Sequence, residues 1–362
     1  MDIRKESSCM LELKDEQAQL AIKNLIEMFG HSSTTFEAEL VYQMIETSLK
    51  LLIENYDTGQ MKLINRSLKE MRHAYRIFNK FKHSRCISIF GSARTPEDHP
   101  DYLAAKDFST KIAQEGWMCI TGAANGIMKA GLEGSQRDSS FGLSIRLPFE
   151  VPTNTVIEGD PKLIVFRYFF TRKLMFLTHS DAIAVFPGGF GTMDELFEIL
   201  TLVQTGKANI IPIVLVEGQD GVYWRDWKKY IDGHLLSNGW ISPEDLHLFY
   251  IAKSVDEAVA HVQKFYHCYH SSRYVGPKLV IRLKKELTDE QISQLNHDYK
   301  GLVSEGKIEK TPPLAGESDH LDLPRIAFCH TNRDFGILRN MIDTINEWEL
   351  LKGSQKPQVE IL

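Results

Sequence analysis

The chain has 362 residues, of which 43% are hydrophobic and 25% are charged, and its formal net charge is −6. This length allows a sizeable core and more than one domain, and the composition is ordinary for a soluble protein. The negative net charge excludes a general electrostatic attraction to nucleic acid or to anionic lipid.

The five cysteines are scattered along the chain and never form a Cys-x-x-Cys pair. Such a pattern indicates reduced thiols rather than a disulfide framework or a zinc site. The first residues lack the apolar core of a signal peptide, and no uncharged apolar stretch of about 18 residues occurs. We therefore expect a cytoplasmic protein with no membrane partner.

Residues 13–82 are expected to be helical throughout, because apolar residues recur at helical spacing. Turn signals interrupt the pattern at residues 30–35 (GHSSTT) and 57–59 (DTG), which gives three helices. The third, from about residue 60 to 81, carries a run of lysines and arginines. A nucleic-acid footprint is one explanation of this run. Since apolar residues are interleaved with it, we favour a solvated or interdomain face and no nucleic-acid partner.

From residue 86 onward, short apolar runs alternate with helical patterns. Strands are expected at residues 86–90, 117–120, 142–147, 182–186 and 210–216. Helices are expected at residues 102–114, 127–134, 162–179, 192–205, 224–234 and 255–266. This alternation is typical of right-handed βαβ units, so we predict an α/β fold with a parallel sheet and helices on both faces.

Three glycine-bearing turns follow predicted strands, at Gly91, residues 122–126 and residues 188–191. Ligands of open parallel sheets bind beyond the carboxyl ends of the strands, so we expect these turns to converge on one crevice. The last turn joins a buried strand to a helix N-terminus, an arrangement that favours phosphate. It lacks the lysine of a P-loop, and the chain contains no GxGxxG, which argues against NAD.

Three charged residues have alternative explanations. Thr192 to Glu195 matches a capping box, with Thr192 as N-cap and Glu195 at the third helical position. Alternatively, the Glu195 carboxylate faces a bound sugar, where it could stabilise an oxocarbenium-like centre or activate water. Arg172 lies in an apolar helical segment and needs a partner, for which a phosphate, Glu195 or another ion pair would serve. Arg94 is either a pocket residue or a surface residue.

The pattern of predicted elements changes from Ser271, where we expect a small α+β unit. Its elements are a strand at 279–283, a helix at 288–303, a loop at 311–322, a strand at 325–330 and a helix at 334–348. The predicted domains are a helical region, 1–82, a nucleotide-binding domain, 83–270, and this unit, 271–362.

Other catalytic patterns are absent from the sequence. Residues 267–270 (HCYH) match no standard zinc spacing, and no GxSxG elbow supports a Ser-His-Asp triad. We expect neither a metal nor another cofactor.

Three motifs together resemble the Lonely Guy family of nucleoside 5′-monophosphate phosphoribohydrolases, whose members have often carried a misleading lysine-decarboxylase label. They are GSAR at residues 91–94, the Arg-Lys pair at 172–173, and PGGFGTMDE at 187–195. The resemblance covers roughly residues 85–266. It implies a modified Rossmann fold, usually dimeric, that hydrolyses the N-glycosidic bond of a nucleotide such as AMP to the free base and ribose 5-phosphate.

The resemblance also implies roles for individual residues. The catalytic pair falls on Arg172 and Glu195, and the phosphate-binding turn falls on Gly188, Gly189, Gly191 and Thr192. The remaining candidates for substrate binding are Ser92, Arg94, Lys173, Gly122, Asn125 and Gly126.

Residues 121–129 (TGAANGIMK) depart from the family's glycine-rich segment. Two glycines are replaced by alanine, and Lys129 stands where many relatives carry glutamate. The added methyl groups would narrow the approach of the backbone to a ligand. The leading interpretation is a nucleotide nucleosidase that forms a homodimer or higher homo-oligomer. The alternative is a non-catalytic nucleotide sensor that signals through its flanking regions.

Overall fold

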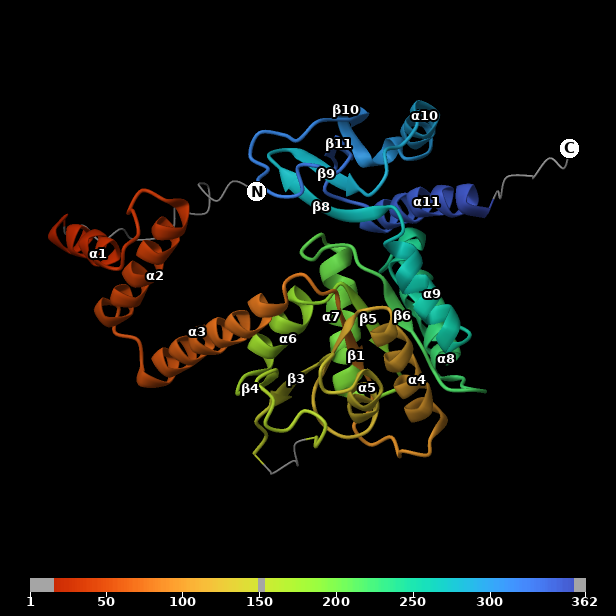
Figure 1. Ribbon diagram of the computed structural model, residues 1–362, viewed down its shortest axis with the longest axis horizontal. Helices are drawn as coiled ribbons and strands as arrows, with labels where there is room; N and C mark the ends of the chain where they lie inside the picture. The colour runs from red at the N-terminus through yellow and green to blue at the C-terminus, as the bar shows by residue number, and fades with distance from the viewer. Residues whose placement is uncertain (1–15, 149–153, 355–362) are drawn as a thin grey trace, which may run out of the picture. The chain divides into compact units, whose positions relative to one another are not determined.

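The structure is a computed structural model that describes residues 16–148 and 154–354 (Figure 1). The chain divides after Arg72 into two compact units. None of the described helices is long and apolar enough to cross a bilayer. The three predicted domains remain a prediction.

The first unit contains the three predicted helices, which the structure confirms; residues 13–15 lie outside the described part. They are α1 (Glu16–Met28), α2 (Phe36–Ile53) and α3 (Thr58–Phe78), the last of which continues into the second unit. The Thr35 side chain caps α2 by accepting a hydrogen bond of 3.2 Å from the amide of Ala38. A small core of Ile22, Ile26 and Ala38 joins α1 to α2.

The second unit is built on a seven-stranded, entirely parallel sheet with the strand order β4-β3-β2-β1-β5-β6-β7. Its strands are β1 (Cys86–Phe90), β2 (Met118–Thr121), β3 (Ser140–Ile145), β4 (Leu163–Phe166), β5 (Ala182–Val185), β6 (Ile213–Leu215) and β7 (Tyr250–Ile251). The predicted α/β fold is therefore confirmed. The chain fills one half of the sheet outward from β1 and then returns to its other side with β5. This reversal places the topological switch point between β1 and β5, where ligands of such sheets bind.

Helices cover both faces of this sheet (Figure 1). They are α4 (Pro100–Gln114), α5 (Ile127–Ser135), α6 (Phe169–Thr178), α7 (Phe190–Gln204), α8 (Tyr223–Tyr230) and α9 (Val255–Phe265). Shorter helical turns occur at Asn79–Phe81, Ile231–Leu236 and Pro243–Leu248. The alternating order of strands and helices agrees with the sequence prediction.

The single helix predicted at residues 162–179 is wrong. The segment forms β4, which pairs with β3, and then the shorter helix α6. Along β4, Ile164 and Phe166 are buried while Val165 is exposed, which is the two-residue period of a strand. Arg167 consequently follows a strand and does not share a helix with Arg172.

The C-terminal part is α+β, as predicted. Its antiparallel sheet has the order β10-β11-β9-β8. The elements are β8 (Tyr269–Val275), β9 (Lys278–Leu283), α10 (Asp289–Asp298), a 3-10 turn (Lys300–Leu302), β10 (Val303–Lys310), β11 (Arg325–His330) and α11 (Phe335–Ser354). The helix predicted to reach residue 303 is too long, because α10 ends at Asp298 and the chain then turns into β10.

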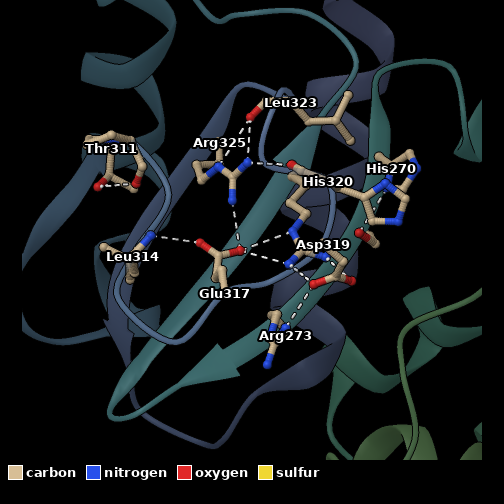
Figure 2. Close-up of polar contacts among 12 residues, drawn as sticks. His270, Arg273, Thr311, Leu314, Glu317, Asp319, His320, Leu323 and Arg325 are labelled. Atoms are coloured by element: carbon tan, nitrogen blue, oxygen red, sulfur yellow. Dashed lines mark hydrogen bonds and ion pairs between the residues drawn. The ribbon is translucent and has the colours of Figure 1, made fainter.

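A buried carboxylate fixes the loop between β10 and β11 (Figure 2). The fully buried side chain of Glu317 accepts hydrogen bonds of 2.8 Å from Arg282 on β9 and from Arg325 on β11. It also accepts a bond of 2.9 Å from the Leu314 amide. Burial alone would raise the pKa of Glu317, but these bonds outweigh it and hold the pKa below its ordinary value.

Helix α11 joins the C-terminal part to the main sheet. Arg339, which is 1% exposed, donates a bond of 3.3 Å to the carbonyl of Ile211 and contacts His261 Nε2 at 3.0 Å. The buried Asn346 accepts from the amides of Cys268 and Tyr269 at 2.8 and 2.9 Å. Because buried polar groups need partners, these contacts make α11 part of one continuous core.

Candidate active site

A cavity of about 740 Å³ lies at the carboxyl ends of β1, β2 and β5. Its wall includes the turns that follow these strands, at Gly91, Gly122 and residues 188–191. The three glycine-bearing turns thus meet in one crevice, as the strand order requires. The first turns of α6 and α7 complete the wall.

The glycine turn after β5 leads directly into α7. Gly189 is the N-cap, and the amides of Thr192 and Met193 both donate to its carbonyl at 3.1 Å. The first N–H groups of a helix have no partner within it, so this end of α7 offers donors and a positive dipole end to an anion. The Ser92 amide donates to the Pro187 carbonyl at 3.1 Å and ties the β1 turn to the β5 turn.

The predicted capping box is wrong. Thr192 is the third residue of α7 rather than its N-cap, and Glu195 lies one turn further along. Glycine can end the preceding turn and cap the helix through its backbone carbonyl, so α7 begins earlier than the threonine signal suggested. The carboxylate of Glu195 is therefore not used for capping.

Arg172 projects from α6 against the back of the cavity. Its Nε donates to the Leu143 carbonyl on β3 at 2.7 Å, and its guanidinium lies 5.2 Å from the ring centre of Phe176. Burial lowers the pKa of Arg172 to about 10, partly offset by Glu195, so the side chain stays cationic at neutral pH. Its direct partner is a backbone carbonyl, which none of the sequence-based alternatives included.

Gly122 has a steric reason to be glycine. A β-carbon at this position would overlap Nη2 of Arg172 and the sulfur of Met128. The backbone of the β2 turn therefore lies directly against the Arg172 guanidinium. A side chain here would require Arg172 and Met128 to shift.

Glu195 is the least exposed of three carboxylates that surround Lys173. Nζ of Lys173 lies 2.7 Å from Asp194, 2.6 Å from Glu198 and 3.6 Å from Glu195. The Glu195 side chain is 12% exposed, against 62% for Asp194 and 42% for Glu198. Burial raises the pKa of Glu195, and the nearby charges of Lys173 and Arg172 offset part of this rise.

Most of the predicted site residues line the cavity. They are Ser92, Arg94, Gly122, Arg172, Gly188, Gly189, Gly191, Thr192 and Glu195. Lys173 lies behind the wall among its carboxylates. Asn125 is exposed, and Gly126 is the N-cap of α5; neither belongs to the wall.

The residues that depart from the family pattern also lie outside the wall. Ala123 is buried in a small cluster with Leu132 and Ile157, and its φ of 56° is unusual for a residue with a β-carbon. Lys129 forms ion pairs with Glu97 and Glu133. The methyl group at 123 and the charge at 129 therefore do not narrow the cavity.

Sequence reasoning missed a tyrosine that supports the glycine turn. The hydroxyl of Tyr223 on α8 donates to the carbonyl of Gly188 at 2.5 Å. Tyr223 also lines an adjoining cavity of about 900 Å³, which shares Phe190 and Met193 with the first. Phe190 is 97% exposed between the two cavities. No sequence signal linked α8 to residue 188, because the contact spans 35 residues.

The protein family described as "Possible lysine decarboxylase" matches residues 113–262. A cytokinin riboside 5′-monophosphate phosphoribohydrolase of Arabidopsis thaliana is 28% identical over 195 residues, which is 52% of this chain and 86% of that protein. The enzyme of the same name from Mycobacterium tuberculosis is 27% identical over 157 residues, which is 43% of this chain and 81% of that protein. These matches confirm the resemblance to the Lonely Guy family.

The regions that match the Lonely Guy relatives cover about half of the chain. Solved structures with related folds include a molybdenum cofactor binding protein from Rippkaea orientalis, with 18% identity, a TM-score of 0.37, and coverage of 50% of this chain and 96% of that one. A molybdenum cofactor carrier protein from Chlamydomonas reinhardtii has 19% identity, a TM-score of 0.36, and coverage of 50% and 97%. At TM-scores this low, these two likenesses add nothing to what the strand order of the sheet already shows about the fold.

Proposed function

We propose that this protein is a nucleotide nucleosidase that hydrolyses the N-glycosidic bond of AMP-like nucleoside 5′-monophosphates to the free base and ribose 5-phosphate. The observation that carries the proposal is the meeting of Arg172, Glu195 and the glycine turn of α7 in one cavity. The activity for which the Lonely Guy relatives are named supports the same class of reaction.

The 5′-phosphate is placed on the turn of Gly188, Gly189 and Gly191. Helix N-terminal amides bind phosphate through directed hydrogen bonds and through the helix dipole. Thr192 and Arg94 also line this cavity, and they would supply a hydroxyl group and a positive charge to the phosphate.

The sugar is placed between Arg172 and Glu195. As the bond between C1′ and the base nitrogen breaks, positive charge develops on the ribosyl ring, and an ionised Glu195 stabilises it and orients the attacking water. Water then forms the new bond to C1′, and the base leaves with a proton. Arg172 orients the substrate and offsets its negative charge.

The reaction as proposed is a hydrolysis that needs no metal or redox cofactor. We further propose that the enzyme acts in the cytoplasm, in keeping with the lack of a disulfide bond among the described cysteines Cys86, Cys119, Cys268 and Cys329. The acting form is a homodimer or higher homo-oligomer.

The test is to incubate the pure protein with a panel of nucleoside 5′-monophosphates and to measure ribose 5-phosphate. Glu195→Gln and Arg172→Ala are each expected to lower kcat by about 100-fold or more, the usual scale for losing a charge that stabilises the transition state. Glu198→Gln is the matched control, because Glu198 shares Lys173 but lies outside the cavity wall.

Absence of product from every nucleotide would overturn the proposal. Tight nucleotide binding by calorimetry without any product would instead identify the sensor. Unchanged turnover in both site variants would show that the hydrolysis occurs elsewhere.

A further inference from the structure

The first three helices expose an unusual amount of apolar surface. On α2, seven large apolar side chains are at least 38% exposed: Phe36, Leu40, Val41, Met44, Leu49, Leu52 and Ile53. Exposed side chains on α1 include Leu20 and Met28, and those on α3 include Ile64 and Leu68. Isolated exposed leucines are normal on a protein surface, but contiguous apolar faces mark interaction sites.

These helices bury only a few of their apolar side chains against one another. The core of this region consists of Ile22, Ile26 and Ala38, which join α1 to α2. In the described part of the chain, α3 packs closely along neither α1 nor α2. Part of α3 is packed, since Ser67 and Glu70 are buried, but its apolar side chains Ile64 and Leu68 are exposed. An amphipathic helix gains most of its stability from packing its apolar face, so the exposed apolar faces of α2 and α3 are expected to have a further partner.

The apolar residues of α3 have the spacing of a helix–helix seam. Met61, Ile64, Leu68 and Met71 follow one another at intervals of three, four and three residues. This is the a/d repeat that brings two helices together by knobs-into-holes packing. The partner of α3 is therefore expected to be another helix.

The charges of the two parts are complementary. Residues 16–57, which contain α1 and α2, carry seven acidic and two basic residues, whereas residues 58–72 of α3 carry four basic residues and one acidic residue. Charges that flank an apolar seam select which helices pair and in which orientation. The acidic pair α1 and α2 is therefore expected to bind a basic helix, and each chain carries both surfaces.

We propose that this region is an interface with a second copy of the chain, in which α1 and α2 of one copy pack against α3 of the other. A two-fold arrangement forms this contact twice, because each copy offers the same two complementary surfaces. The interface buries the apolar faces and pairs acidic with basic residues. It lies outside the proposed active site and does not depend on the proposed reaction.

The test measures the mass of the full-length protein by sedimentation velocity, with charge reversals on each surface. The α3 variant is Lys62→Glu, Lys69→Glu and Arg72→Glu, and the α2 variant is Glu37→Lys, Glu39→Lys and Glu54→Lys. The wild type is expected to contain an even number of chains, and each variant to have half its mass. An equimolar mixture of the two variants is expected to regain the wild-type mass, since their reversed charges are again complementary.

Two controls separate this interface from general effects. Lys300→Glu with Lys307→Glu reverses two exposed charges of the C-terminal part and is expected to leave the mass unchanged. Leu68→Gln changes no charge and is expected to halve the mass through loss of the apolar seam, so the test does not depend on how the charge-reversed helices fold.

The proposal is overturned if the wild type is monomeric, or if both charge variants keep the wild-type mass. It is also overturned if a chain that carries both sets of reversals regains the mass while the mixture does not, because the contact would then lie within one chain. Loss of copurified nucleic acid from the α3 variant at unchanged mass would assign the basic helix to nucleic acid instead.

Discussion

Opposing influences act on the carboxyl group of Glu195. Burial raises its pKa, while Lys173 at 3.6 Å and the charge of Arg172 lower it. The effect of burial is the larger one, so the pKa of Glu195 is raised and the group takes up a proton at a higher pH than an ordinary glutamate does. The proposed mechanism needs the ionised form, which makes this balance visible in the pH dependence of the reaction.

The first prediction concerns that pH dependence. We expect kcat to fall as the pH drops through the raised pKa of Glu195, so the acid limb lies above the ordinary glutamate value of about 4.3. Lys173→Met removes a charge that favours the ionised carboxylate and is expected to move the limb to still higher pH. Rate–pH profiles of both proteins test this; a limb that moves downward or stays in place contradicts the assignment.

The second prediction uses neighbouring residues of the β2 turn. Gly122→Ala is expected to lower kcat/KM by about 10-fold or more, because the new methyl group displaces Arg172 and small misplacements are costly in catalysis. Ala123→Gly, whose side chain lies outside the cavity, is the control and is expected to keep the wild-type kcat/KM. Equal effects of the two changes in steady-state kinetics would refute a specific contact with Arg172.

At the scale of elements, α8 supports the glycine turn of residues 188–191 through the hydrogen bond from Tyr223 to Gly188. Our third prediction is that Tyr223→Phe raises KM about 2- to 12-fold with little change in kcat, which corresponds to the typical net value of one hydrogen bond, about 0.5–1.5 kcal/mol. Tyr230→Phe is the control, because Tyr230 lies half exposed on the same helix. A loss confined to kcat would argue against a role in binding the phosphate.

The loop between β10 and β11 depends on the ionised state of Glu317. Its pKa is lowered in the folded protein, so the stabilisation is complete above the unfolded pKa and is lost as the pH falls through the folded pKa. Our fourth prediction is that Glu317→Gln lowers the free energy of unfolding by about 3–5 kcal/mol at pH 7, because the buried Arg325 loses its carboxylate partner and the buried Arg282 keeps only Asp319.

Urea unfolding at several pH values checks this prediction. The difference between wild type and variant is expected to shrink as the pH falls below the glutamate range. Glu309→Gln, at an exposed ion pair with Lys278, serves as the control and is expected to change stability by less than about 1 kcal/mol.

The sequence predicted those elements whose pattern is strong. Buried strands such as β1 and β5 are short apolar runs bounded by turn residues, and the order of strands and helices followed from them. The polar strands β8 (YHSSRYV) and β10 (VSEGKIEK) were missed, because strands at a sheet edge carry no apolar run. The error at β4 and α6 has the opposite cause. Both segments are apolar and adjacent in the sequence, so they were predicted as one helix.

The candidate site was predictable where glycines and charges form a motif. Arg172, Glu195 and the glycine turn are close in sequence to one another. The Leu143 carbonyl that holds Arg172 and the Tyr223 hydroxyl that holds Gly188 could not be predicted, since backbone acceptors and long-range contacts leave no local pattern. The placement of Ala123 and Lys129 away from the cavity also required the structure.

At the scale of the whole second unit, Arg339 links the last helix to the main sheet. Our fifth prediction is that Arg339→Met lowers the free energy of unfolding by about 2–4 kcal/mol, because it leaves the Ile211 carbonyl and the Asp343 carboxylate without their partner. Urea denaturation followed by fluorescence measures this change. The exposed Arg333→Met is the control, and equal destabilisation by the two variants would show that the buried contacts do not matter.

The position of α11 has a consequence for synthesis on the ribosome. Arg339 contacts Ile211, which lies 128 residues earlier in the chain, and Phe335 fills the space above Gly206. The parallel sheet therefore cannot complete its packing until α11 has left the exit tunnel. A nascent chain stalled before α11 leaves this side of the sheet uncovered, and a chaperone that binds apolar surface would find its target there.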